Sequence, residues 1–278
     1  MSGFSSVVTR SVEKIYRRAL ADSWDNTGLL LEAPQDRPHA RTVLLTNDLT
    51  TAVADEAIEN KSVGAIVSYH PIIFRGLKSI TLSNPQQRSL LRLAAAGIHV
   101  YSPHTAVDAA VDGVNDWLSR GIAGNGDGIS ACSVLQSNDS MQEGEGYGRL
   151  VELKEAVTLA DLVQRAKKLT GLKHVQVCAP KGLDVLISKV SLCAGSGGSV
   201  VMGTKAELYF TGELSHHQVL EAAANGISVI LCGHSNTERG YLTEVMKEKL
   251  LQSFREDPNG KDVEVCVSTA DKDPLMTM

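Results

Sequence analysis

The stretch Ala65-Ile66-Val67-Ser68-Tyr69-His70, followed by Pro71, is a short apolar run that ends on a histidine. Two further stretches have the same form, Ile98-His99-Val100-Tyr101-Ser102-Pro103-His104 and Val229-Ile230-Leu231-Cys232-Gly233-His234. Short apolar runs bounded by turn residues are typical of buried strands. Functional sites in α/β proteins gather beyond the carboxyl ends of such strands. We therefore expect three strands that each deliver a histidine to a site.

Two of these histidines are followed, four residues later, by a carboxylate: Asp108 after His104, and Glu238 after His234. Near the start of a helix this spacing lets both side chains face the same way. Neutral imidazoles and carboxylates are ligands of borderline or hard divalent metals. An acidic residue in a first helical turn is also explained by the helix dipole, and His70 by itself could simply cap a loop. Neither alternative explains the repeated pairing, which favours a metal site.

Strand-length apolar runs alternate along the chain with segments of helical period, which predicts the α/β class with a largely parallel or mixed sheet. Residues 121–148 are rich in glycine and are predicted to form a linker or mobile loop. The expected strands are Arg41–Thr46, Val63–Ser68, Ile98–Ser102, Arg149–Leu153, Val175–Cys178, Val185–Cys193, Leu208–Thr211, Ser228–Leu231 and Val263–Val267. The expected helices lie near Val12–Leu20 and over 51–60, 84–96, 106–120, 159–169, 199–202, 215–225 and 237–254.

Composition excludes several classes of protein. The formal net charge is -5 and no dense Lys/Arg cluster is present, which argues against direct nucleic-acid binding. No apolar stretch approaches the roughly 18 residues of a membrane helix, so no membrane association is expected. The five cysteines are scattered without a Cys-x-x-Cys pair, which suits a reducing compartment and excludes a disulfide oxidoreductase. We expect a cytoplasmic protein, and Arg10, Arg17 and Arg18 make the mitochondrion the alternative.

Three polar or glycine-rich segments remain. The segment Thr211–His217 includes Glu213 and the adjacent His216 and His217, whose side chains diverge by about 100° on a helix, so both cannot face one ion. The loop with Gly195, Ser196, Gly197 and Gly198 offers backbone N–H groups for a phosphate or carboxylate. It lacks the Gly-Lys-Ser/Thr ending of a P-loop, so a plain tight turn is the alternative. Trp24-Asp25-Asn26-Thr27-Gly28 indicates only a turn by composition.

Taken together, five motifs resemble the Nif-three-like family, the GTP cyclohydrolase I type 2 homologues. In chain order they are Trp24-Asp25-Asn26-Thr27-Gly28-Leu29, Tyr69-His70-Pro71, His104-Thr105-Ala106-Val107-Asp108, Thr211-Gly212-Glu213-Leu214-Ser215-His216-His217 and Gly233-His234-Ser235-Asn236-Thr237-Glu238-Arg239. The resemblance implies a two-lobed α/β fold in which each lobe is a mixed sheet flanked by helices. It implies a first lobe of residues 1–123 plus 245–278 and a second of 124–244. It also implies a homohexamer with a di-metal centre in the cleft between the lobes.

Carried over by position, the resemblance makes His70, Asp108, His234 and Glu238 the metal ligands. The residues expected to line or support the same cavity are Tyr69, His104, Glu213, His216 and His217. One departure matters, because bacterial members typically have two adjacent histidines where this chain has Tyr69-His70. A phenol in place of an imidazole removes a good neutral ligand, so one or two divalent ions per chain are expected. Zinc, manganese, iron and nickel all suit this ligand set.

A metal site of this kind serves hydrolysis by lowering the pKa of a bound water. We therefore expect a metal-dependent hydrolase acting on a nucleotide-like or phosphorylated small molecule. The alternative is a non-catalytic metal-binding regulatory protein that interacts with transcriptional regulators, as eukaryotic relatives are described. A serine or cysteine hydrolase is disfavoured, because no Gly-x-Ser-x-Gly stands in strand–turn–helix context.

Overall fold

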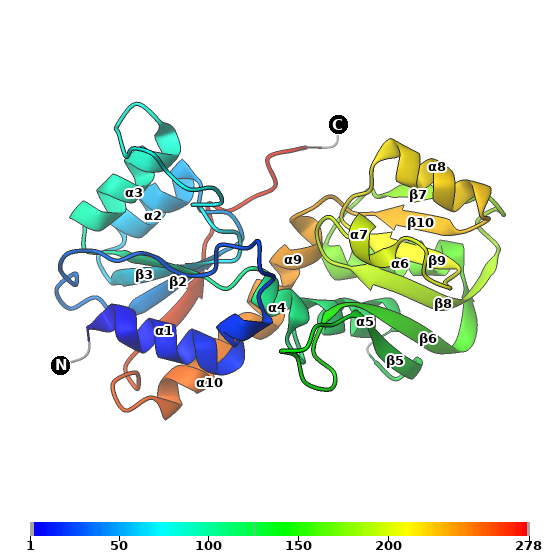
Figure 1. The fold of residues 1–278 in the computed structure, drawn as a ribbon, viewed down its shortest axis with the longest axis horizontal. Helices are drawn as coiled ribbons and strands as arrows, with labels where there is room; N and C mark the ends of the chain where they lie inside the picture. The colour runs from blue at the N-terminus through cyan, green and yellow to red at the C-terminus, as the bar shows by residue number, and fades with distance from the viewer. Residues whose placement is uncertain (1–2, 125, 277–278) are drawn as a thin grey trace. The chain divides into compact units, whose positions relative to one another are not determined.

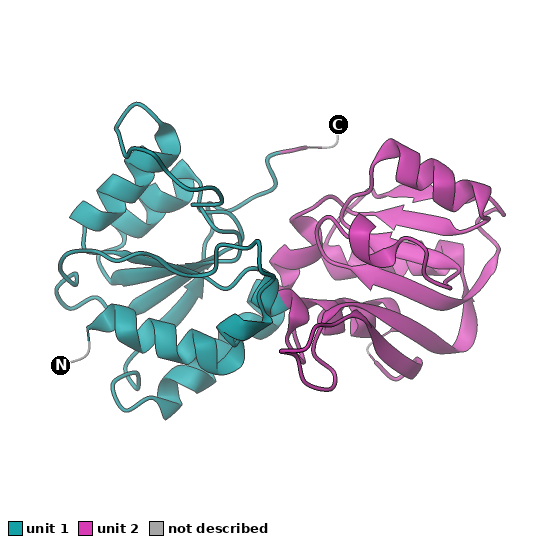
Figure 2. Cartoon of the chain, in the orientation of Figure 1, with its two compact units in different colours: residues 1–107, 242–274 teal, residues 108–241, 275–278 magenta. Residues whose placement is uncertain are grey.

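The computed structural model describes residues 3–124 and 126–276. It divides the chain into two compact units: unit 1 comprises residues 1–107 and 242–274, and unit 2 residues 108–241 and 275–278 (Figure 2). Each unit contains one mixed β-sheet with helices packed on it (Figure 1). The α/β class expected from the alternating pattern is therefore confirmed.

Unit 1 holds a five-stranded sheet in the order β1-β4-β3-β2-β11, in which β1 and β4 are antiparallel and the other neighbours are parallel. Helices α2 and α3 cover one face of this sheet, and α1 and α10 cover the other (Figure 1). The strands are β1 (Gly28–Leu31), β2 (Thr42–Thr46), β3 (Val63–Ser68), β4 (His99–Ser102) and β11 (Glu264–Val267). The helices are α1 (Phe4–Ile15), a 3₁₀ turn (Arg18–Leu20), α2 (Thr51–Glu59), α3 (Pro85–Ala95) and α10 (Lys247–Glu256).

The central strands of unit 1 are buried on both faces, which explains their continuous apolar runs. Every residue of β2, β3 and β4 is buried, and Leu44, Ile66 and Val100 pack with residues of α2 and α3 in one core. Helix α3 starts at Pro85 because the Asn84 side chain caps it, accepting hydrogen bonds from the first-turn backbone N–H groups. This core holds the carboxyl ends of β2, β3 and β4 in place. Polar residues follow each of these strands in the chain.

Unit 2 holds a six-stranded sheet in the order β5-β6-β8-β9-β10-β7. Strands β8, β9 and β10 run parallel, whereas β5, β6 and β7 pair antiparallel with their neighbours. The strands are β5 (Ile129–Gln136), β6 (Tyr147–Thr158), β7 (Gln176–Cys178), β8 (Leu186–Cys193), β9 (Leu208–Thr211) and β10 (Ser228–Leu231). The helices are α4 (Thr105–Ala109), which straddles the unit boundary, α5 (Val114–Ile122), α6 (Leu159–Thr170), α7 (Gly198–Val201), α8 (His216–Ala224) and α9 (Asn236–Tyr241).

One apolar cluster of unit 2 joins the sheet to α7 and α8, with Cys193, Val201, Tyr209, Ala222 and Val229 at its centre. Helix α8 begins with a capping box: the Ser215 side chain accepts from the Gln218 backbone, and the Gln218 side chain accepts from the Ser215 N–H. Because β8, β9 and β10 are parallel, the loops that follow them emerge at the same edge of the sheet.

The glycine-rich stretch 121–148 contains a strand, so the predicted linker is wrong over residues 129–136. Strand β5 pairs antiparallel with β6 along its length. The buried Arg149 guanidinium donates to the carbonyl oxygens of Gly144 and Gly146, at 3.3 and 2.6 Å, and to the Asp116 carboxylate. Sequence composition missed this strand because β5 lies at the sheet edge with mostly exposed residues, and its order comes from pairing with β6.

Two helices predicted as continuous are interrupted. The expected helix over 106–120 is two helices, α4 and α5, because Asp112 adopts a left-handed backbone with φ of 54°. The Asp116 carboxylate accepts a hydrogen bond from the Asp112 N–H at 2.7 Å and stabilises that turn. The expected helix over 237–254 is α9, a π-helical turn over Leu242–Met246, and α10. Such interruptions keep the apolar period, so periodicity does not reveal them.

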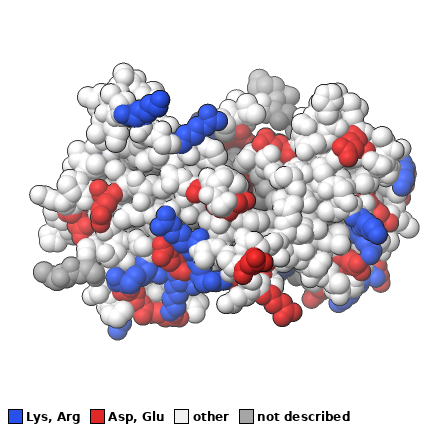
Figure 3. Space-filling view, in the orientation of Figure 1, with Lys and Arg blue, Asp and Glu red and all other residues white. Residues whose placement is uncertain are grey.

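On the face drawn in Figure 3, Lys and Arg side chains lie among Asp and Glu side chains.

Among the residues that the structure describes, no helix has the length and apolar character needed to cross a membrane.

Candidate metal-ligand residues

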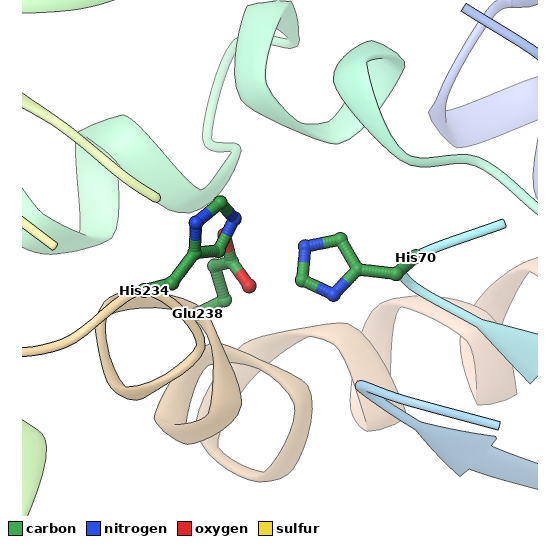
Figure 4. Close-up of side chains that lie close together, drawn as sticks. All are labelled: His70, His234 and Glu238. Carbon is green, nitrogen blue, oxygen red and sulfur yellow. The ribbon is translucent and has the colours of Figure 1, made fainter. Parts of the chain in front are cut away.

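In unit 2, His234 and Glu238 project to the same side at the start of α9 (Figure 4). His234 follows β10, and its Nε2 lies 3.5 Å from the Glu238 Oε1. The Glu238 side chain is 3% exposed and the His234 side chain 39% exposed. A buried carboxylate is favourable only when cations or hydrogen-bond donors compensate its lost hydration, so this position suits a metal ligand. The i, i+4 pair expected from the sequence therefore exists as a geometric pair.

The other ring nitrogen of His234 faces a second carboxylate. His234 Nδ1 lies 2.7 Å from the Oε1 of Glu213. Glu213 follows β9, which is the parallel neighbour of β10. A carboxylate at Nδ1 accepts the ring proton and leaves Nε2 with its lone pair, the form that binds a metal. Glu213, predicted to support the site, thus lies against His234.

The glycine loop after β8 packs directly against this pair. A side-chain Cβ at Gly195, whose φ is +62°, would lie 2.8 Å from the Glu238 Oε1 and 2.9 Å from the His234 Nε2. The Gly195 N–H donates to the Thr237 hydroxyl at 2.8 Å, and the Gly197 N–H to the Thr211 hydroxyl at 3.1 Å. Gly195 therefore lets the backbone approach the two ligand atoms. Because these two N–H groups bond inside unit 2, binding of an anion by Gly195, Ser196, Gly197 and Gly198 stays a prediction.

In unit 1, His70 follows β3 and has the same kind of partner. Its Nδ1 lies 2.9 Å from the Oδ1 of Asp48 and 3.3 Å from the Asn47 Nδ2. Asp48 follows β2, the parallel neighbour of β3, just as Glu213 follows β9 beside β10. Asp48 could not be predicted as a supporting residue from the sequence, since Asn47-Asp48-Leu49-Thr50 looks like an ordinary turn before a helix.

His104 provides the third case of a carboxylate at Nδ1. Its Nδ1 lies 2.7 Å from the Oδ1 of Asp25, whose side chain is fully buried. The other Asp25 oxygen accepts hydrogen bonds from the Thr105 N–H at 3.1 Å and the Thr105 hydroxyl at 2.5 Å. Burial acts to raise the pKa of Asp25, but these bonds and the His104 charge outweigh it, so the pKa lies below its usual value. Composition alone had indicated only a turn around Asp25.

Aromatic rings surround the His104 imidazole within unit 1. The ring centroids of Trp24, Tyr69, His70 and Phe74 lie 6.0, 6.0, 5.3 and 6.5 Å from that of His104. Tyr69 is 1% exposed, so its phenol ring is part of the packed interior. The structure therefore brings together three residues that the sequence predicted for one site: Tyr69, His70 and His104.

Other predicted residues lie elsewhere in unit 2. Burial, followed by the charges of Asp108 and Glu238, raises the pKa of the Cys193 thiol. His216 and His217 are exposed at the start of α8, and His216 lines a shallow pocket of about 260 Å³ with residues of β7 and β10. Roles for Asp108, His216 and His217 in metal binding stay predictions.

Among the residues that the structure describes, the candidate metal ligands are His70 in unit 1 and His234 and Glu238 in unit 2. Each offers one ligand atom, a ring nitrogen or a carboxylate oxygen. Two neutral imidazoles and a carboxylate fit a divalent transition metal, and zinc, manganese, iron and nickel all accept such ligands. The donor set does not distinguish between these ions.

The fold and these residues define a class: a two-unit α/β protein with imidazole and carboxylate groups at the carboxyl ends of its parallel strands. Residues 5–274 match the family model Duf34/NIF3 (NGG1p interacting factor 3), so the chain belongs to the Duf34/NIF3 family. The family resemblance drawn from the five motifs is thereby confirmed.

Individual relatives agree with this assignment. The chain is 68% identical to the protein NIF3 homolog of Schizosaccharomyces pombe over 277 residues, covering 100% of this chain and 99% of that protein. It is 43% identical to the NGG1-interacting factor 3 of Saccharomyces cerevisiae, covering 96% and 95%. A crystal structure of a hypothetical protein from Staphylococcus aureus shares the fold with a TM-score of 0.82 at 21% identity, covering 99% of each chain.

Proposed function

We propose that this chain binds a divalent metal through His70, His234 and Glu238, with Asp108 as a further ligand. The observation that carries the proposal is the arrangement around His234. Its Nδ1 faces Glu213 at 2.7 Å, and its Nε2 lies 3.5 Å from Glu238. A histidine with one nitrogen on a carboxylate and the other beside a buried carboxylate has the usual surroundings of a metal ligand. The Asp48 carboxylate prepares His70 in the same way.

The function that this ligand set supports best is metal-dependent hydrolysis of a nucleotide-like or phosphorylated small molecule. A bound divalent ion supplies a water of lowered pKa and a positive charge for an oxygen of the substrate. When the Nδ1 proton of His104 is donated to Asp25, Nε2 of that ring is left to take a proton from a reacting group. We propose His104 as the general base on this ground.

A second candidate function is metal-dependent regulation through protein partners, without turnover. One S. cerevisiae relative is named for interaction with NGG1, which supports a protein partner for this chain. The substitution at Tyr69 also favours it, because a buried phenol stands where bacterial members have an imidazole. Fewer good ligands leave a site better suited to structural metal binding than to a two-metal reaction.

The metal content per chain tests whether the chain binds a metal, which both candidate functions require. Protein purified without added metal or nickel affinity is analysed by mass spectrometry of metals, before and after reconstitution. About two equivalents support a di-metal hydrolase, and about one supports a reduced site. His234→Ala and Glu238→Ala should each abolish most of the metal content. His174→Ala, at an exposed histidine outside the proposed set of ligands, is the control. Absence of metal after reconstitution would contradict the proposal.

Turnover separates the two candidate functions. The metal-loaded chain is assayed against a panel of nucleotides and phosphoesters, beside Asp108→Ala. Hydrolysis that Asp108→Ala abolishes, while the variant keeps its fold by circular dichroism, supports the enzyme. A folded, metal-loaded chain that hydrolyses nothing in the panel favours the regulatory protein.

Assembly and location belong to the same proposal. We propose a homohexamer, as the family resemblance implies, and a cytoplasmic location, with the mitochondrion as the alternative. All five cysteines are free thiols, which agrees with a reducing compartment. Sedimentation velocity and microscopy of a tagged chain test these two points.

A further inference from the structure

Two large aromatic side chains stand exposed beside the histidines of unit 1. Trp24 is 59% exposed and Phe74 is 54% exposed. Their ring centroids lie 6.0 Å apart with an interplanar angle of 56°, so the two rings are in tilted contact and are not stacked face to face. Exposed aromatic rings leave apolar area in water, and a pair of them marks a surface that something else covers.

The two rings are held in place. The Asn26 Nδ2 donates to the Ile73 carbonyl at 2.5 Å, which ties the turn that carries Trp24 to the segment that carries Phe74. Both rings also lie edge-to-face with His104, whose own orientation Asp25 maintains. A surface positioned in advance binds a flat ligand with a smaller loss of conformational entropy.

Positive charge lies in the same segment. Arg75 and Lys78 are exposed, and residues 72–84 contain no acidic side chain. Within the described parts of the chain, neither cation makes an ion pair. One exposed cation directly after Phe74 in the chain, and a second three residues further on, fit a ligand that combines a flat ring with an anionic group.

We propose that Trp24 and Phe74 form a stacking surface for the base of a nucleotide, and that Arg75 and Lys78 attract its phosphate. The proposal rests on the function proposed above and specifies its substrate class. The position supports it, because the His104 ring, which lies edge-to-face with both exposed rings, is 5.3 Å from the His70 ring, centroid to centroid. A protein partner is the rival occupant, but the fixed imidazole and the two cations favour a small anionic ligand.

Tryptophan fluorescence provides a direct test, because the chain has two tryptophans and the other, Trp117, is 4% exposed and packs against Tyr241. A base stacked on Trp24 should quench the fluorescence of the exposed residue. The metal-loaded chain is titrated separately with guanosine 5′-monophosphate, guanosine and inorganic phosphate. We expect quenching by the nucleotide at the lowest concentration, weaker binding of guanosine, and no quenching by phosphate.

Variants assign the signal, with binding also followed by calorimetry. Phe74→Ala should weaken nucleotide binding about tenfold, within the range for loss of one stacking ring. Trp24→Ala should weaken it as much, and Trp24→Phe should restore it. The double variant Arg75→Ala/Lys78→Ala should weaken binding of the nucleotide but not of guanosine. Leu183→Ala, at an exposed apolar residue of unit 2, is the matched control and should leave binding unchanged.

Two outcomes overturn the proposal. One is the absence of nucleotide binding up to millimolar concentration by a folded, metal-loaded chain. The other is binding that Trp24→Ala and Phe74→Ala leave intact. Metal content measured on the same samples distinguishes the two proposals, since loss of metal contradicts the proposed function, whereas normal metal content without nucleotide binding contradicts only the stacking surface. Binding of another protein that these variants abolish, without nucleotide binding, assigns the surface to a partner instead.

Discussion

His234 in unit 2 and His70 in unit 1 have the same support but different surroundings. Each follows a strand of a parallel pair, and the neighbouring strand supplies the carboxylate at its Nδ1, Glu213 in one case and Asp48 in the other. Beyond that point they differ. His234 has the buried Glu238 carboxylate and the Gly195 backbone at its other nitrogen, whereas the His70 ring lies 5.3 Å from the rings of both Tyr69 and His104.

This difference suggests a division of roles. The surroundings of His234 are negatively charged, and a glycine backbone rather than a side chain lies beside the ligand atoms. Such surroundings favour the binding of a cation. The surroundings of His70 consist of aromatic rings. These rings orient the imidazole and could contact an organic ligand. The same supporting contact, a carboxylate from the end of the adjacent strand, therefore occurs in two different environments.

The largest effect is expected from Gly195→Ala. The new Cβ would lie within 2.9 Å of both the His234 Nε2 and the Glu238 Oε1. We expect metal affinity to fall by more than the roughly 10–100-fold that loss of a supporting carboxylate costs. Gly203→Ala is the matched control, because Gly203 also has a positive φ of 76° but an added Cβ meets nothing within 4 Å. Calorimetric titration with zinc measures the affinity of both variants. If the two affinities are equal, Gly195 does not lie beside the metal ligands.

A smaller effect is expected from removing each supporting carboxylate. Glu213→Ala should lower metal affinity within the range of about 10–100-fold, because His234 loses the partner that sets its tautomer. Asp48→Ala should lower it less, because ring packing against Tyr69 and His104 still orients His70. Glu213→Gln and Asp48→Asn, which keep an oxygen acceptor, should recover part of the loss. The same calorimetric titration ranks the four variants, and a larger effect at Asp48 would reverse the comparison.

The smallest effect on metal binding is expected from Asp25→Asn, which should act mainly on stability. The buried carboxylate accepts bonds from His104 and Thr105, so its loss should cost about 1–3 kcal/mol of unfolding free energy at pH 7. Because the folded-state pKa of Asp25 lies below its ordinary 3.8, its contribution is present above that pH and is lost as the pH falls through the folded-state pKa. Urea unfolding of wild type and variant should therefore converge under acid, and a constant difference would contradict this assignment.

Several elements could be predicted from the sequence because their information is local. The strand Val63–Ser68 has the bounds that its apolar run predicted, and so do Leu208–Thr211 and Ser228–Leu231. The pair His234 and Glu238 was also predictable, because a separation of four residues places two side chains on one side of a helical turn. The strand Ile129–Gln136 was not, since pairing with its neighbour rather than its own composition orders it.

By itself, the sequence determined the alternation of strands and helices, the family, and the histidines and acids that could bind a metal. Only the tertiary structure decided how those histidines are supported. Asp25, Asp48 and Glu213 stand 79, 22 and 21 residues away from their histidines along the chain, and sheet pairing brings them within 3 Å. The reason is physical: periodicity reports which face a residue occupies within one element, whereas a hydrogen bond between strand ends depends on which strands become neighbours.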